Sequence, residues 1–137
     1  MKKILLFAAS LAAFCGCTTV TVSKEGGHTM VVVENSGWRL FNFIPTASGD
    51  PDRPNEVSCR LFTDTVSVEN NMKLLERTMR EEGAVDYRDV VTYTTEESIF
   101  VILVKRYYCH TTAQLVMPDA EKTAAEDSPR EEDGTAK

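Results

Sequence analysis

The N-terminal segment constrains this chain most, because it limits which residues are left to form a fold. Lys2 and Lys3 precede the apolar run Ile4–Phe14, and the small and thiol residues Cys15-Gly16-Cys17 follow. A basic start, a short apolar stretch and a small-residue exit are typical of a secretory signal peptide. The apolar run is too short to span a bilayer, which takes roughly 20 residues. We therefore expect residues 1–16 to be a signal peptide that is absent from the mature protein.

The exit of this segment, Phe14-Cys15-Gly16-Cys17, resembles the lipobox of bacterial lipoproteins, whose cysteine is acylated and becomes the first residue of the mature chain. The resemblance implies lipidation at Cys17, which follows the small residue Gly16. Cys15 is a competing site, and an unlipidated secreted protein is the alternative. Two or three acyl chains would make a permanent anchor. Thr18, rather than Asp, follows the cysteine, so the resemblance implies the outer membrane, on its periplasmic side, in a cell that has one.

Charge limits the partners of the mature chain. The whole sequence has a formal net charge of −6, which becomes more negative when Lys2 and Lys3 are removed. This balance argues against nucleic acid as a partner, since such binding needs a basic patch, and against a polybasic membrane contact. Residues 118–137 are rich in Ala, Glu and Asp with almost no large apolar side chain, so we expect a disordered acidic tail.

The remaining residues contain one firm helix signal. Ser67 can cap a helix whose first turn holds Glu69, and the apolar residues recur at helical spacing. Gly83 can end this helix in a left-handed turn. The apolar stripe comprises Val68, Met72, Leu75 and Met79.

Strand signals lie on both sides of this helix. The β-branched and aromatic segments predict strands at Thr29–Glu34, Trp38–Pro45, Val85–Thr95 and Ile99–Val116, and the segment 57–62 is either a short strand or the lead-in to the helix. Turns are expected at Asn35-Ser36-Gly37 and Glu96-Glu97-Ser98. The run Ile99–Val104 is apolar on both faces, which predicts a central strand covered on both sides.

These elements predict an α+β fold. One amphipathic helix would pack on a small, mostly antiparallel sheet in the order β-β-α-β-β, giving two layers. In this interpretation residues 17–27 are a membrane tether, residues 28–117 form a single α+β domain and residues 118–137 form the tail.

Two cysteines remain for this domain, Cys59 and Cys109. An exported chain with an even number of thiols suggests a disulfide between them. Two separately buried thiols are the alternative, because free cysteine is a good core residue.

No constellation predicts catalysis or metal binding. The two histidines, His28 and His110, sit in no recognisable motif. Cys109 and His110 are adjacent in a strand and would point to opposite faces, so they would not meet as nucleophile and base. The cysteines and histidines also lack the close pairing of zinc ligands. We expect no catalytic residue, no metal and no cofactor.

Two segments are candidates for binding a partner. The first segment has aromatic side chains beside an arginine, and such side chains, when exposed, are typical of protein-binding hot spots. Its candidate residues are Trp38, Arg39, Phe41 and Phe43. The second segment contributes Lys105, Arg106 and Tyr108, which could meet an acidic partner. The alternatives are burial of both faces of the first strand and a solvated strand end for the second.

Two functional hypotheses follow. The first is a non-enzymatic, lipid-anchored accessory or protein-interaction module that binds another envelope protein. The second is a small-ligand-binding or enzymatic domain with a pocket between helix and sheet, lined by residues such as Tyr93 and Tyr107.

Overall fold

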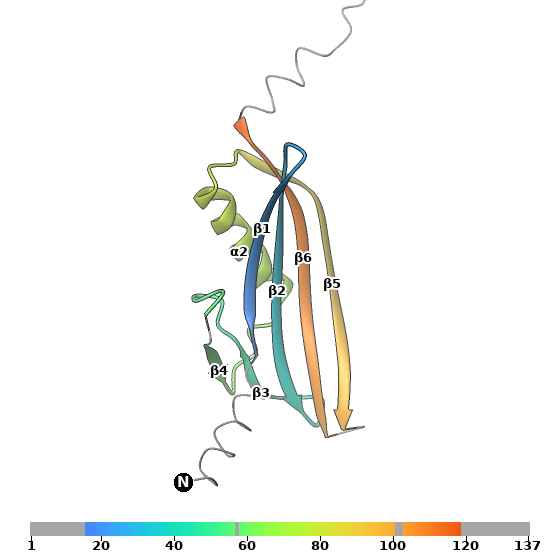
Figure 1. The fold of residues 1–137 in the computed structure, drawn as a ribbon. Coiled ribbons are helices and arrows are strands. Elements are labelled where there is room, and N and C mark those ends of the chain that lie inside the picture. The colour runs from blue at the N-terminus through green and yellow to red at the C-terminus, as the bar shows by residue number, and fades with distance from the viewer. Residues whose placement is uncertain (1–15, 57, 101–102, 119–137) are drawn as a thin grey trace, which may run out of the picture.

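The protein is dominated by one antiparallel sheet (Figure 1). The computed structural model describes residues 16–56, 58–100 and 103–118. In chain order the elements are β1 (Thr18–Glu25), β2 (His28–Leu40), β3 (Ile44–Gly49), β4 (Cys59–Leu61), α2 (Val68–Glu81), β5 (Asp86–Phe100) and β6 (Val104–Val116). The predicted signal peptide, apart from Gly16, and the predicted tail, apart from Pro118, lie outside the described residues.

Strand β2 organises the sheet, whose order is β4-β3-β2-β6-β5 with β1 also paired to β2. One edge of β2 pairs with β6 along Thr29–Leu40. Its other edge is divided, because β1 pairs along His28–Asn35 and β3 along Gly37–Leu40. The chain therefore enters the sheet at Thr18, beside the middle of β2.

The predicted α+β class with two layers is wrong. Among the described residues six elements are strands and one is a helix, so the fold is mostly antiparallel sheet with a single 14-residue helix. Helix α2 lies on one side of the sheet, which we call the inner face (Figure 1). At 1.5 Å per residue its 14 residues span about 21 Å, whereas the 13 residues of β2 span about 43 Å at roughly 3.3 Å per residue. The predicted order β-β-α-β-β also missed strands, because the expected tether is a strand and the expected strand Trp38–Pro45 is divided between two strands.

The first of these segments is the predicted tether. Thr18–Glu25 is strand β1, and Gly26 and Gly27 join it to β2 in a hairpin with φ of 57° and 80°. Two consecutive positive φ angles are what a two-residue hairpin turn requires, and glycine adopts them without strain. The folded domain therefore includes residues 18–27 rather than beginning at residue 28.

The predicted turn at Asn35-Ser36-Gly37 is also wrong, because these residues lie inside β2. Both polar side chains are buried but hydrogen-bonded: the Asn35 amide donates to the Thr65 carbonyl at 2.8 Å, and the Ser36 hydroxyl accepts from the Cys17 amide at 2.9 Å. The turn occurs further on, where Phe41 and Asn42 have φ of 52° and 70°. It divides the predicted strand Trp38–Pro45 between β2 and β3.

The run Ile99–Val104 is not a central strand. Strand β5 is at an edge of the sheet and continues through Glu96–Ser98, where a turn was expected. The apolar run instead spans the end of β5 and the start of β6, and Ile99 and Leu103 are exposed. A short apolar run is compatible with a buried strand or with a hairpin end, and the sequence pattern alone cannot separate the two.

The helix prediction is confirmed in its position and its cap. Ser67 is the N-cap and accepts from the Asn70 amide at 3.2 Å, and Gly83 follows the helix with φ of 71°. The predicted stripe is confirmed at Leu75, which is fully buried, and Met72 and Met79 are half-buried against the core, but Val68 is exposed. The residues that face the sheet are Asn71, Leu74, Leu75 and Thr78.

The core lies between α2 and the inner face of β2 and β6. It comprises Val31, Val33, Leu74, Leu75, Ala113 and Leu115. Asn71 adds a polar contact, because its buried amide donates to the Cys109 carbonyl at 2.9 Å and the Thr111 hydroxyl at 3.3 Å. The helix is thus held by apolar packing and by one hydrogen-bonded asparagine.

Candidate interaction surface at one end of the sheet

Figure 1 shows the end of the sheet where β2 and β5 end and β6 begins. Several large apolar residues in the segments near this end have exposed side chains. They come from the β2–β3 turn and the start of β3, from the end of β5 and the residue before β6, and from the residues that end or follow β4. Phe43 and Phe62 are 74% and 78% exposed. We call this surface the apolar end; it comprises Phe41, Phe43, Ile44, Leu61, Phe62, Ile99 and Leu103.

Backbone contacts hold the apolar end together. The Phe41 amide donates to the Leu103 carbonyl at 3.0 Å, which joins the β2–β3 turn to the residue before β6. The Phe62 amide donates to the Thr46 carbonyl at 3.1 Å, which keeps the residues after β4 beside β3. Single exposed apolar residues need no explanation, but a group drawn from several segments marks an interaction surface.

Behind the apolar end lies a band of aromatic and cationic side chains, formed by Trp38, Arg39, Arg106, Tyr107 and Tyr108. The Arg106 guanidinium lies 5.4 Å from the Trp38 ring centroid and 4.8 Å from that of Tyr108, within cation–π range. Arg39 lies 4.0 Å from the Tyr107 ring centroid. We call these five residues the aromatic–cationic band.

Asp64 fixes the inner side of this band. It accepts from Arg39 Nη2 at 2.8 Å and from the Tyr107 hydroxyl at 2.9 Å. Burial, together with the neighbouring Asp64 carboxylate, raises the pKa of Tyr107. The tyrosine therefore stays protonated and keeps donating to Asp64 under all ordinary conditions.

The two predicted partner-binding segments form one surface. In the β2–β6 register Trp38 pairs with Arg106 and Arg39 with Lys105, although these residues are far apart in the sequence. Their exposure differs from the prediction, because Trp38 is only 5% exposed. Three of the predicted partner-binding residues already interact with carboxylates of the same chain. Arg39 forms an ion pair with Asp64, Lys105 forms one with Glu96 at 3.4 Å, and the Tyr108 hydroxyl donates to Glu97 at 3.3 Å. The freely exposed members are Phe41 and Phe43.

Sequence reasoning missed the other members of the apolar end. Leu61, Phe62, Ile99 and Leu103 belong to short apolar runs that the pattern assigned to core strands or to the approach to the helix. The available signal was the absence of polar alternation in these runs, which fits exposed strand ends as well as buried strands. Assigning them to one surface required the strand register.

The predicted lipidation site, Cys17, lies at the start of the sheet with its side chain exposed. Its amide donates to the Ser36 hydroxyl at 2.9 Å, and its carbonyl accepts from the Ser36 amide at 2.8 Å. The next residue, Thr18, is buried and donates to the Asn35 side chain at 2.9 Å. Cys17 therefore has an ordered backbone and an accessible thiol.

The structure does not support the predicted bridge between Cys59 and Cys109. Cys109 is a fully buried free thiol on β6. Cys59 is on β4, and strands β3 and β2 lie between the two. Burial raises the pKa of the Cys109 thiol, so it stays protonated and unreactive.

The face of the sheet opposite α2, here called the outer face, carries an aromatic stack. The His110 ring lies 4.8 Å from the Tyr93 ring and 5.8 Å from the Tyr108 ring, between centroids, and Glu34 Oε2 lies 3.8 Å from His110 Nδ1. Cys109 faces the core instead, as strand alternation predicts. Exposed apolar residues on the outer face include Val32, Val91 and Tyr93.

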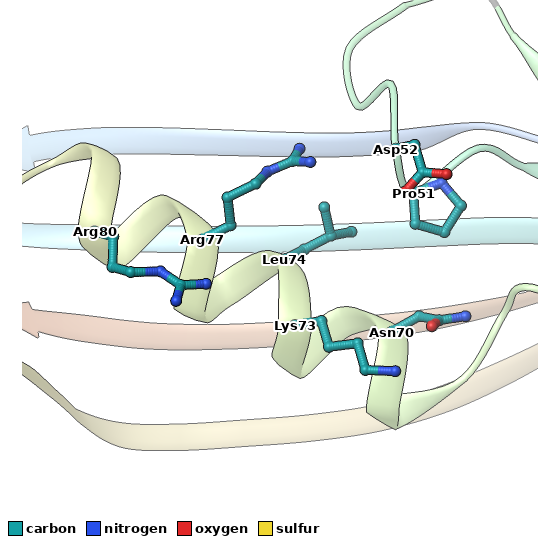
Figure 2. Close-up of a pocket in the computed structure, with 7 residues that line it drawn as sticks. All are labelled: Pro51, Asp52, Asn70, Lys73, Leu74, Arg77 and Arg80. Carbon is teal, nitrogen blue, oxygen red and sulfur yellow. The ribbon is translucent and has the colours of Figure 1, made fainter.

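The helix borders a cavity of about 320 Å³ (Figure 2). Three cationic side chains project from α2 into its lining, while Pro51 and Asp52 come from the loop after β3. The lining residues are Pro51, Asp52, Asn70, Lys73, Leu74, Arg77 and Arg80. The predicted pocket lining is different: Tyr93 is on the outer face and Tyr107 is buried on the inner face, so one pocket cannot include both.

Neither a membrane span nor a metal centre is found in residues 16–56, 58–100 and 103–118. No helix in these ranges is both long and apolar enough to cross a membrane. No group of three or more His, Cys, Asp or Glu side chains in them is placed to hold a metal ion. No protein-family model matches the chain, and no curated protein or solved structure matches it either.

Proposed function

We propose that this chain is a lipid-anchored protein of the bacterial cell envelope, with an acylated Cys17 as its first mature residue. It acts without catalysis, as an accessory or interaction module. The observation that carries the proposal is the position of Cys17, whose thiol is exposed while its backbone is hydrogen-bonded into the sheet. Cleavage after Gly16 would leave an α-amine on Cys17, and N-acylation would convert it to a new amide. Both forms keep an N–H, so the bond to Ser36 is compatible with the lipidated residue.

The outer face is the surface we propose for another envelope protein. Val32, Val91 and Tyr93 are exposed there beside the ring of His110, on the side of the sheet opposite α2. Aromatic residues are enriched in protein interfaces, and the polar residues around them suit a rim.

The cavity beside α2 favours a second candidate function, binding of a small anionic ligand. Its lining includes three cationic side chains, Lys73, Arg77 and Arg80. One carboxylate, that of Asp52, partly offsets their positive charge. Among the described residues, the lining includes no serine, cysteine or histidine, so it suits electrostatic binding more than nucleophilic catalysis. Increased thermal stability in the presence of inorganic phosphate, lost in Arg77→Ala, would favour this function.

Cys17→Ser should abolish acylation of the protein expressed in a bacterial envelope, because serine offers no thiol for the lipid. The measurement is the intact mass of protein extracted from membranes. For the wild type we expect the mass of residues 17–137 plus acyl chains.

Cys15→Ser is the matched control and should keep the acylated mass of the wild type. An acylated Cys17→Ser protein, or a wild-type chain that begins elsewhere without lipid, would contradict the proposed anchor.

A photo-crosslinking residue at Val91 should give one discrete protein adduct in intact cells. The same residue at Glu76, exposed on the solvent side of α2, serves as the control and should give none. Electrophoresis and mass spectrometry would identify the adduct. Identical adducts from both positions would exclude a specific partner on the outer face.

A further inference from the structure

We propose that the apolar end rests in the interfacial layer of the same bilayer that holds the lipid on Cys17. This inference rests on the proposed function, and it names the bilayer as the occupant of the apolar end. It assigns the domain one orientation on the membrane, in which the apolar end contacts the bilayer and the outer face is free for a protein partner.

The first step is the missing tether. Cys17 is hydrogen-bonded through both its amide and its carbonyl to Ser36, and Thr18 begins strand β1. The acyl chains therefore leave the folded domain directly, through a single cysteine side chain. A domain attached in this way stays against the bilayer surface, whereas a flexible linker would let it move away and turn.

The second step is the distance from Cys17 to each end of the sheet. Cys17 lies beside Ser36, and β2 ends at Leu40, about 13 Å further at roughly 3.3 Å per residue. The opposite end of β2, at His28, is about 26 Å away by the same rise. The apolar end is the nearer of the two.

The third step is the contrast in chemistry between the two ends. The far end consists of the β1–β2 hairpin together with the start of β5 and the end of β6. The hairpin residues 24–28 are all exposed and include Lys24, Glu25 and His28, and Val85, before β5, is an exposed apolar residue there. The near end presents a larger group of exposed phenylalanine, leucine and isoleucine side chains, from strand ends and from the residues beside them. One end suits water, and the other suits the acyl-chain boundary of a bilayer.

The fourth step is the order of side chains along the strands above the apolar end. The β2–β3 turn itself, Phe41-Asn42-Phe43, contains no charged residue. The aromatic–cationic band follows within a few residues on β2 and β6. Within this band Trp38 and Tyr107 are buried, whereas Arg39, Arg106 and Tyr108 are partly exposed. Tyrosine at headgroup level, with arginine reaching toward water, is the usual arrangement at a membrane interface, and these three side chains are the members placed to contact headgroups.

Depth-dependent quenching of tryptophan fluorescence tests the inference. The acylated full-length mature protein is reconstituted into vesicles of phosphatidylethanolamine and phosphatidylglycerol with or without brominated acyl chains. Phe43→Trp places the probe in the apolar end, and Tyr93→Trp places a matched aromatic probe on the outer face. Trp38 contributes the same background to both variants, and the wild-type signal corrects for it.

We expect brominated lipids to quench the added emission of Phe43→Trp several-fold more than that of Tyr93→Trp. Equal quenching, or stronger quenching of Tyr93→Trp, would overturn the proposed orientation. Unquenched Phe43→Trp emission together with a dimer cross-linked through the apolar end would assign that surface to a second copy and also overturn it. These outcomes leave the proposed anchor standing, because only protein whose acylated mass has been verified enters the assay.

Discussion

Leu75→Ala is expected to lower the free energy of unfolding by about 3 to 4 kcal/mol, within the range for truncating a fully buried leucine. Leu75 has no exposed surface and packs in the cluster that joins α2 to β2 and β6. Alanine would remove the transfer free energy of the lost methyl groups and leave a cavity, since surrounding strands cannot collapse fully around it. For a small domain, whose total stability is about 5–15 kcal/mol, this is a large fraction.

Leu61→Ala is the matched control, because the same chemical change is made at a side chain that is 60% exposed. We expect it to change stability by less than about 0.5 kcal/mol. Urea unfolding followed by far-ultraviolet circular dichroism measures both variants. Equal effects of the two substitutions would show that α2 does not cover the sheet as described.

The helix could be predicted because its signals are local. The Ser67 cap, Glu69 in the first turn and the apolar spacing act within four residues of one another. The strands depend instead on partners that are distant in the sequence. Asn35-Ser36-Gly37 has the composition of a turn, but Thr18, Cys17 and Thr65 supply hydrogen bonds that satisfy these residues inside β2. Tertiary contacts therefore outweigh the local turn preference there.

The candidate surface was predictable only in parts for the same reason. Composition identified Phe41 and Phe43 in one segment and Arg106 in another as residues of an interface. Their proximity depends on the register that places Trp38 opposite Arg106, and no local pattern encodes that pairing. The sequence pattern placed the ends of these strands several residues from their positions in the structure. It therefore did not predict that Trp38 is buried and Ile99 exposed.

Gly49→Ala should destabilise the protein by about 3 kcal/mol, the upper part of the usual range for overpacking. A Cβ atom at position 49 would lie 2.2 Å from Thr18 Oγ1 and 2.5 Å from the Cys17 carbonyl carbon. The second contact is with backbone, so no change of rotamer relieves it. Alanine would push the start of β1 away from β2 and β3.

The variant Thr18→Ala identifies which of the two contacts matters. It removes the hydroxyl near Gly49 but leaves the Cys17 backbone in place, so Gly49→Ala with Thr18→Ala should be no more stable than Gly49→Ala alone. Recovery of stability in the double variant would mean that the hydroxyl, rather than the backbone of Cys17, requires glycine. Urea unfolding of the four proteins in this cycle measures the difference.

The same substitution connects the fold to the anchor. Lys24 lies on β1 and pairs with Glu82 at 2.9 Å, so it is held on the sheet while β1 is paired with β2. The Lys24 side chain is already exposed, so what protects it from trypsin is the pairing of its backbone in the sheet. In Gly49→Ala the displaced strand should release this backbone, and cleavage there should free the domain from membranes faster than in the wild type. Unchanged release would show that β1 stays paired despite the collision, and that Gly49 does not secure the junction between lipid and sheet.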